Sequence, residues 1–339
     1  MESNRILLIA PIFYNYHIEI KKELEKQGYI VDFYDDRPSK NAISIGLIKL
    51  KKNLMKKSID HYMDKIINDT KNRKYKDVFI INNVAFEKEH IEKLKNNHGE
   101  ARFILYLWDS IENYKHNKDV LSYFERVFSF DPKDCEKYHV KFLPLFYTDK
   151  YRKINEDKEK NIYDLMSICT AHPIRYPLLN DLKKYCQDNK IRLFSYLYLA
   201  TPLLYIYNKI FVEVFKKAKI REFHFKPLTE NEIIRIMSQT KAVFDICNEN
   251  QNGLTIRTIE TIGARKKLIT TNKNIVKYDF FNKNNIHIIE SENFKIPKNF
   301  FDEGYIKISQ EIYQQYNLKN WINKIFQENK EGKSEGSSS

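Results

Sequence analysis

The sequence predicts an α/β protein of two Rossmann-like domains, whose parallel sheets face each other across a cleft. Short apolar runs alternate with amphipathic helical stretches from the N-terminus onward, and the alternation restarts after a highly charged stretch at 147–161. At 339 residues the chain is long enough for two domains of ordinary size. We therefore expect an N-terminal domain at 1–150 and a C-terminal domain at 162–308.

The first domain opens with an apolar run at 5–13, an amphipathic stretch that ends at Gly28, and a second apolar run at 29–34. Strand, helix and strand in so few residues are typical of a Rossmann-like domain. No G-x-G-x-x-G pattern follows the first run, which disfavours a dinucleotide cofactor. Further apolar runs predict the remaining strands of this domain at 77–82, 102–108, 127–130 and 141–146.

The most informative stretch spans residues 242–272, AVFDICNENQNGLTIRTIETIGARKKLITTN. A strand leads through an Asn-Gly turn to a helix that Thr255 caps and Gly263 ends, and another strand follows. Arg257 and Glu260 lie three apart, so they share a face near the start of this helix. Helix amides and an arginine attract phosphate, and a carboxylate accepts hydrogen bonds from sugar hydroxyls. An ordinary Arg–Glu surface pair explains the spacing equally well.

Together with the preceding residues from 223 onward, this stretch resembles the donor-binding half of GT-B glycosyltransferases, above all the bacterial CgeB-like and capsule or lipopolysaccharide transferases. In that family a helix carrying Arg and Glu follows a strand and a loop, and the Glu binds the ribose of the nucleotide-sugar. The resemblance is good over 223–272 and architectural elsewhere. It implies a set of donor-binding residues: Arg175, Lys226, Arg257, Thr258 and Glu260.

Two residues of the first domain are candidates for a general base. His17 begins the first helix, at the edge of the sheet where such folds bind ligands, and imidazole titrates near neutral pH. Asp109 follows the strand at 102–108 on the same side. Local packing of the histidine and helix capping by the aspartate are the competing interpretations. The resemblance adds that several inverting GT-B enzymes keep a His in this loop, whereas a retaining enzyme needs no such base.

Composition argues against several other classes of protein. The four cysteines form no C-x-x-C pair and no His cluster accompanies them, so structural zinc is not expected. No D-x-D ends a strand, and we expect neither a metal nor another cofactor. The net charge of +13 suggests an anionic partner. Nucleic acid is disfavoured because the sequence shows no zinc spacing, helix-turn-helix or basic-aromatic motif.

A lysine-rich amphipathic pattern at 43–67 predicts a helix that either lies on anionic lipid or is a surface helix with snorkelling lysines. The uncharged run at 193–208 is too short to span a membrane, and the N-terminal apolar run is too short for a signal peptide. These features predict a cytoplasmic protein, with peripheral contact at the inner membrane face left open.

A C-terminal helix at 309–328 is expected to cross back onto the first domain, as in GT-B folds, followed by a polar tail at 329–339. The combined prediction is a metal-independent glycosyltransferase of surface polysaccharide biosynthesis. It would move a sugar from a nucleotide-diphosphate donor to a saccharide or lipid-linked acceptor. The alternatives are a sugar-nucleotide epimerase on the same fold and a non-catalytic nucleotide- or nucleic-acid-binding protein.

Overall fold

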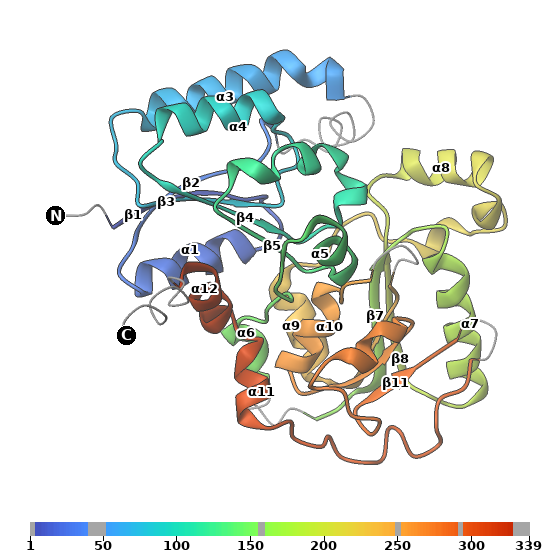
Figure 1. Cartoon of the computed structure of the whole chain (residues 1–339). Coiled ribbons are helices and arrows are strands. Elements are labelled where there is room, and N and C mark those ends of the chain that lie inside the picture. The colour runs from blue at the N-terminus through green and yellow to red at the C-terminus, as the bar shows by residue number, and fades with distance from the viewer. Residues whose placement is uncertain (1–3, 40–51, 155–159, 248–251, 291–293, 328–339) are drawn as a thin grey trace, which may run out of the picture.

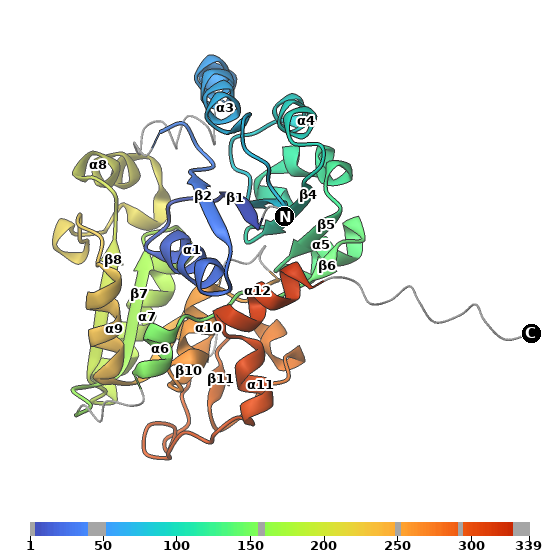
Figure 2. The same cartoon turned by 90° about the vertical axis from the view of Figure 1, so that its left-hand side faces the viewer.

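Two parallel sheets, each covered by helices, form the two halves of the molecule (Figures 1 and 2). The computed structural model describes residues 4–39, 52–154, 160–247, 252–290 and 294–327. Both sheets and the crossover helices between their strands confirm the predicted α/β class with two Rossmann-like domains.

The first sheet has the strand order β2-β1-β3-β4-β5-β6, and every neighbouring pair is parallel. Its strands are β1 Arg5–Ile9, β2 Ile30–Tyr34, β3 Asp77–Ile81, β4 Arg102–Leu107, β5 Arg126–Ser129 and β6 Lys141–Phe142. Alternate side chains of β1 serve opposite faces of the sheet, because successive residues of a strand point to opposite sides. Ile6 and Leu8 pack towards α1 (Tyr16–Lys26), whereas Leu7 and Ile9 pack towards α3 (Lys56–Thr70) and α4 (Lys88–Asn97).

The second sheet is also parallel, in the order β11-β10-β9-β7-β8. Its strands are β7 Tyr163–Thr170, β8 Leu193–Tyr198, β9 Thr240–Asp245, β10 Lys267–Thr270 and β11 Ile286–Ile288. The helix α7 (Arg175–Asp188) covers one face, and α9 (Glu230–Ser238) covers the other together with the C-terminal end of α10 (Ile256–Gly263). The helix predicted between Thr255 and Gly263 is therefore confirmed.

The chain passes from one domain to the other through the helix α6 (Asp149–Lys153), which packs on α10. The charged composition predicted a plain linker here, but Tyr147 and Tyr151 are both buried. The Tyr147 amide donates to the Tyr316 carbonyl at 2.8 Å, and its carbonyl accepts from the Leu318 amide at 3.0 Å. The start of the expected linker is thus part of the core.

The C-terminal helix returns to the first domain as predicted, but in two pieces, α11 (Gln310–Gln315) and α12 (Leu318–Phe326). The single helix expected at 309–328 breaks where Tyr147 pairs with the main chain, and the Asn317 side chain caps α12 by accepting from the Asn320 amide at 2.8 Å. Figure 1 shows α12 beneath the first sheet beside α1.

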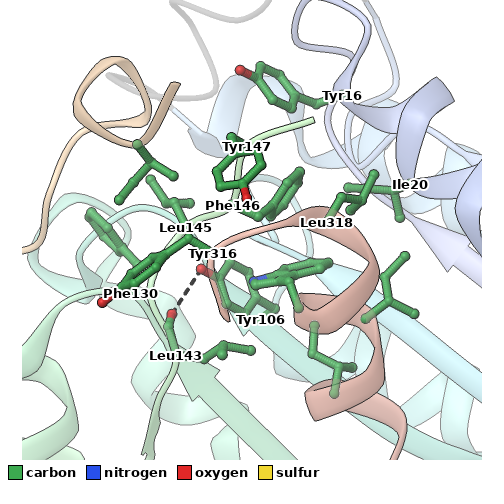
Figure 3. Packing of buried hydrophobic residues seen from close by; sticks show 14 of the residues in the cluster. Tyr16, Ile20, Tyr106, Phe130, Leu143, Leu145, Phe146, Tyr147, Tyr316 and Leu318 are labelled. Atoms are coloured by element: carbon green, nitrogen blue, oxygen red, sulfur yellow. Dashed lines mark hydrogen bonds between the residues drawn. The ribbon is translucent and has the colours of Figure 1, made fainter. Parts of the chain in front are cut away.

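One hydrophobic cluster joins both domains and the C-terminal helices. Trp321 of α12 packs on Tyr106 and Phe146, with ring centroids 4.7 Å and 4.5 Å apart. Figure 3 shows this region, including the 3.0 Å hydrogen bond that the Tyr106 hydroxyl donates to the Leu143 carbonyl. The same cluster contains Ile259 of α10. The position of α10 relative to the first domain is therefore set by buried packing.

The helix α8 (Pro202–Phe211) ends at Phe211 because Val212 adopts an extended conformation. The lysine-rich helix expected at 43–67 is described only from residue 52, as a short 3-10 turn (Lys52–Met55) followed by α3, so its first part lies outside the described residues.

Gly263 allows α10 to approach the crossing segment. A Cβ at this position would lie 2.5 Å from Cγ of Tyr147, whose ring is buried and cannot move aside. We therefore expect Gly263→Ala to lower the free energy of unfolding by about 1–3 kcal/mol, as overpacked cores do. Urea unfolding measures the effect. Gly304→Ala is the matched control, since a Cβ added there would meet no atom within 4 Å and its stability should not change; equal stability of both variants would contradict this packing.

Candidate active site

A cavity of about 620 Å³ lies between the two domains. The first domain contributes the loop after β1, including Phe13, Tyr14 and Tyr16. The second domain contributes the carboxyl ends of β7, β8 and β9 and the first turns of α9 and α10. Parallel sheets of this kind bind ligands beyond the carboxyl ends of their strands, so this is the expected location for a site.

The start of α10 is held by a small network that its own sequence provides. The Thr255 hydroxyl caps the helix by accepting from the Thr258 amide at 3.1 Å and donates to Asp245 at 2.5 Å. The Thr258 hydroxyl donates to the same carboxylate oxygen at 2.7 Å. Thr258, which the resemblance implied as a donor ligand, is buried and does not line the cavity. In this structure it fastens α10 to the end of β9.

Arg257 and Glu260 lie together at the bottom of the cavity, with 2.6 Å between the guanidinium and the carboxylate. Glu260 is only 2% exposed, which rules out the ordinary surface pair that the spacing also allowed. Its other oxygen accepts a hydrogen bond from the hydroxyl of Tyr16, the first residue of α1. The helix α10 is therefore linked directly to the first domain.

Burial and charge both shift the titration of these groups. Burial raises the pKa of Glu260 above its ordinary value, although Arg257 and the tyrosine hydroxyls act in the opposite direction. Burial and the nearby carboxylate raise the pKa of Tyr16 well above its usual range. Burial alone would lower the pKa of Arg257, but Glu260 and the surrounding tyrosines raise it. The arginine therefore stays charged at every accessible pH.

A second polar link crosses the cavity close by. Glu230, at the start of α9 and 4% exposed, accepts from the Asn15 side chain at 2.8 Å and from Lys150 at 2.6 Å. Lys150 also contacts Glu19 of α1 at 3.2 Å. Burial would lower the pKa of Lys150, but the hydrogen bonds to both carboxylates raise it. Two acidic groups from different domains thus share one cation on the crossing helix.

Arg175 is the first residue of α7 and lines the cavity from the other side. Its Nε atom is buried and finds no hydrogen-bond partner among the described residues. The N-terminal ends of α7 and α10 both border the cavity, which adds positive potential near Arg175. Lys226, by contrast, is exposed and lies just outside the lining, although Pro227, Leu228 and Thr229 line it.

A second cavity of about 330 Å³ adjoins the first at the carboxyl ends of β1, β3 and β4. Six lining residues are common to the two cavities, and Arg175 is among them. Asp109 lines the second cavity beside Trp108 and Arg37. His17 lines neither cavity, and its ring packs on Phe33 of β2 with 5.1 Å between centroids. The structure therefore brings Asp109, not His17, close to Arg175.

Sequence reasoning overlooked the groups that connect the domains at this site. Tyr16, Tyr151 and Glu230 surround the Arg257–Glu260 pair, yet each lies far from it in the chain. The only sequence signal was the aromatic loop IFYNYH after the first strand. Asp245 was also overlooked, although an aspartate that follows a buried strand is a recognisable pattern.

Neither a metal site nor a membrane span is evident in the described part of the chain. Within that part, no three His, Cys, Asp or Glu side chains are grouped as metal ligands. The metal-independent chemistry expected from the sequence stays a prediction. No helix among the described residues has the length and apolar character to cross a bilayer. Burial raises the pKa of the Cys169 thiol in the cavity wall to about 11, so this thiol is a poor nucleophile.

Comparison with known proteins gave structural matches only. No protein-family model matches the chain, and no curated protein sequence does. Sucrose-phosphate synthase from Thermosynechococcus elongatus superposes with a TM-score of 0.55 at 8% identity, over 85% of this chain and 86% of that one. An α-glucosyltransferase in complex with UDP and a DNA 13-mer gives a TM-score of 0.53 at 13% identity, over 83% of this chain and 81% of that one.

Two further structures match almost the whole chain. HepE from Anabaena, in complex with UDP and glucose, gives a TM-score of 0.50 at 11% identity over 95% of both chains. A protein from Listeria monocytogenes that is described as a putative UDP-N-acetylglucosamine 2-epimerase gives a TM-score of 0.51 at 10% identity, over 96% of this chain and 95% of that one. At such low identities the matches establish only the fold. That fold consists of two facing Rossmann-like domains and a C-terminal helix that returns to the first domain. The chain has the GT-B fold.

Proposed function

We propose that this protein is a glycosyltransferase that moves a sugar from a nucleotide-diphosphate donor to a hydroxyl of a saccharide or lipid-linked acceptor. The observation that carries the proposal is the pair of adjoining cavities between the domains. The larger cavity is lined by Arg175 and Arg257, which can bind anions, and by Glu260, which can bind hydroxyl groups. The smaller cavity is lined by the Asp109 carboxylate of the first domain. Solved proteins of the same fold are recorded with UDP and glucose, which supports a nucleotide-sugar donor.

The larger cavity suits a nucleotide diphosphate. Arg175 and the N-terminal ends of α7 and α10 would bind the diphosphate and stabilise the negative charge that develops as it leaves. Arg257 adds a second fixed cation. Glu260 would accept hydrogen bonds from the ribose hydroxyls, and Lys226 at the rim would approach the diphosphate from solvent. Thr258 contributes indirectly, by holding α10 against Asp245.

In the smaller cavity, Asp109 is the group we assign as general base. The bond between the anomeric carbon and the diphosphate oxygen breaks, and the acceptor oxygen forms a new bond to that carbon. The acceptor proton passes to the Asp109 carboxylate. His17, the first candidate from the sequence, becomes the second choice because it lines neither cavity. In this proposal the reaction needs no metal, because arginines and helix N-termini stabilise the negative charge on the departing diphosphate.

A sugar-nucleotide epimerase is the second candidate function, favoured by the match to the Listeria monocytogenes protein. Such an enzyme would convert the nucleotide-sugar without any acceptor. Incubation with the donor alone, followed by analysis of the nucleotide-sugar product, separates the two functions. Formation of an epimerised nucleotide-sugar from the donor alone would contradict the transferase proposal. A donor that stays unchanged by itself and is consumed once an acceptor is added would support it.

Binding of a nucleoside diphosphate is the first expected result. In a thermal-shift screen of the diphosphates UDP, GDP, ADP and dTDP, with the monophosphate CMP alongside, a ligand at 100 times its Kd adds about 2.7 kcal/mol of stability. Arg175→Ala should raise the Kd of that ligand about 10- to 100-fold, because a charge-assisted hydrogen bond is lost. Glu260→Ala should also reduce the shift.

Arg221→Ala is the matched control, since Arg221 is an exposed arginine of the same domain that lines neither cavity. Its nucleotide shift should equal that of the wild type. Absence of a shift with every nucleotide, or an equal shift in Arg175→Ala, would contradict the proposed donor site.

Tyr16 and the ribose are expected to compete for Glu260. The Tyr16 hydroxyl already occupies one carboxylate oxygen, so a bound ribose has to displace it. Tyr16→Phe should therefore lower the unliganded stability by about 1–3 kcal/mol and lower the nucleotide Kd about fivefold. Thermal unfolding with and without nucleotide measures both effects.

Tyr106→Phe controls for the loss of a buried tyrosine hydroxyl that lines neither cavity. Its hydroxyl donates to the Leu143 carbonyl, so this variant should lose stability without a change in nucleotide affinity. A weaker nucleotide affinity in Tyr16→Phe would show that the hydroxyl assists donor binding, contrary to this expectation.

The base assignment predicts that Asp109→Asn lowers kcat about 100-fold or more while KM changes little, since an amide cannot accept the acceptor proton. Steady-state kinetics on a working acceptor measures it, with the exposed Asp119→Asn as control. A parallel His17→Gln variant distinguishes the two candidates. Loss of kcat in that variant alone would assign the base to His17, and full activity in both would indicate a reaction without a base.

A further inference from the structure

The helix α8 exposes an apolar surface. Seventeen large apolar side chains are exposed in the described part of the chain, and seven of them lie within 203–214. Leu203 is 77% exposed and Phe211 is 69% exposed. The others on the helix itself are Leu204, Ile206, Tyr207 and Ile210. We refer to these six residues as the α8 patch.

This helix is oriented with its apolar side outward. Only Tyr205 of α8 is buried, and its hydroxyl donates to the Ala218 carbonyl at 3.0 Å. A helix on the surface of a soluble domain normally turns its apolar stripe inward and its polar side chains to water. Here the outward side carries leucine, isoleucine and aromatic residues. Contiguous exposed apolar surface of this kind marks an interaction site.

Basic side chains are held next to the α8 patch. Lys209 donates to the Ala218 carbonyl at 3.1 Å, beside the Tyr205 bond, so the segment after the helix folds back along it. That segment packs against Tyr205 and carries four exposed basic residues within ten positions of the end of the patch: Lys216, Lys217, Lys219 and Arg221. Over 202–221 there are five basic residues and one acidic residue, Glu213.

We propose that α8 and the basic segment after it form a docking surface for a membrane that contains anionic lipid. Apolar and aromatic side chains would enter the boundary between headgroups and acyl chains, and the lysines would contact lipid phosphates. The proposal adds a binding surface to the molecule and does not depend on the proposed transferase activity.

Charge distinguishes this occupant from a second copy of the chain. A symmetric dimer through α8 would place the same patch on both partners, so each set of basic residues would face or adjoin the other. An anionic lipid surface instead complements them. The place of α8 also suits a flat partner, because Figures 1 and 2 both show it at the periphery of the second domain.

The docking surface lies close to the cleft. Tyr198, the last residue of β8, lines the larger cavity, and Thr201 caps α8 three residues later by accepting from the Leu204 amide at 3.1 Å. A membrane held against α8 would therefore lie near the mouth of the cavity. If the acceptor is lipid-linked, this arrangement brings its hydroxyl towards the site; that single consequence rests on the proposed function.

Vesicle co-sedimentation of the full chain tests the proposal. The probes are phosphatidylcholine vesicles with and without phosphatidylglycerol. Wild type should bind the anionic vesicles, less at high salt, because screening weakens the lysine contacts. Leu203→Ser/Phe211→Ser should lower binding about tenfold or more, since two large apolar side chains no longer enter the lipid. Lys217→Glu/Lys219→Glu should lower binding to the anionic vesicles by a similar factor.

Ile162→Ser/Ile306→Ser is the matched control, because these isoleucines are also exposed but lie outside the α8 patch. It should bind as the wild type does. Failure of the wild type to bind anionic vesicles, or unchanged binding by Leu203→Ser/Phe211→Ser, would overturn the proposal. So would a solution dimer that this variant abolishes, since a second copy would then occupy the patch. Unchanged thermal unfolding and nucleotide shifts of the variants keep this outcome separate from the donor-site proposal.

Discussion

Tyr147 connects three parts of the chain whose relative positions determine the site. Its main chain pairs with residues on both sides of the break between α11 and α12, and its hydroxyl donates to the Tyr313 carbonyl at 2.9 Å. Its ring packs on Gly263 at the end of α10, and the Tyr313 hydroxyl donates to the Gly263 carbonyl at 2.6 Å. Because α10 carries Arg257 and Glu260, this contact determines where these two side chains lie relative to the first domain.

Burial of the Arg257–Glu260 pair has an unfavourable desolvation free energy, because both charged groups lose their contacts with water. Tyr16 reduces that cost by donating a hydrogen bond from its hydroxyl to the Glu260 carboxylate. A pair maintained in this way keeps its geometry before any ligand arrives. In the proposed transfer reaction, such preorganised charge would stabilise the departing diphosphate, because groups that are already oriented need not reorganise during the reaction. As a contribution to stability alone, the buried pair is poorly explained.

Local patterns were enough to predict most of the fold. Apolar runs placed the strands, and Thr255 and Gly263 bounded α10, because capping and helix termination depend on neighbouring residues. Local patterns of this kind could not predict the hydrogen bonds between the two domains. Tyr16 and Glu260 are 244 positions apart, and Asn15 and Glu230 are 215 apart. The break before α12 was missed for the same reason, since it depends on pairing with Tyr147. Sequence spacing suggested Arg257 and Glu260 as a pair, and only the structure could show that the pair is buried and not on the surface.

Polar side chains of the two domains are linked across the larger cavity. Tyr16 occupies Glu260, and Lys150 lies between Glu19 and Glu230. A ligand that needs the oxygen held by Tyr16 cannot gain it by collision alone, because that hydrogen bond must first break. The kinetics of capture then contain a unimolecular step before the final complex. The observed rate should level off at high ligand concentration, and the plateau would report how often the hydrogen bond between Tyr16 and Glu260 breaks.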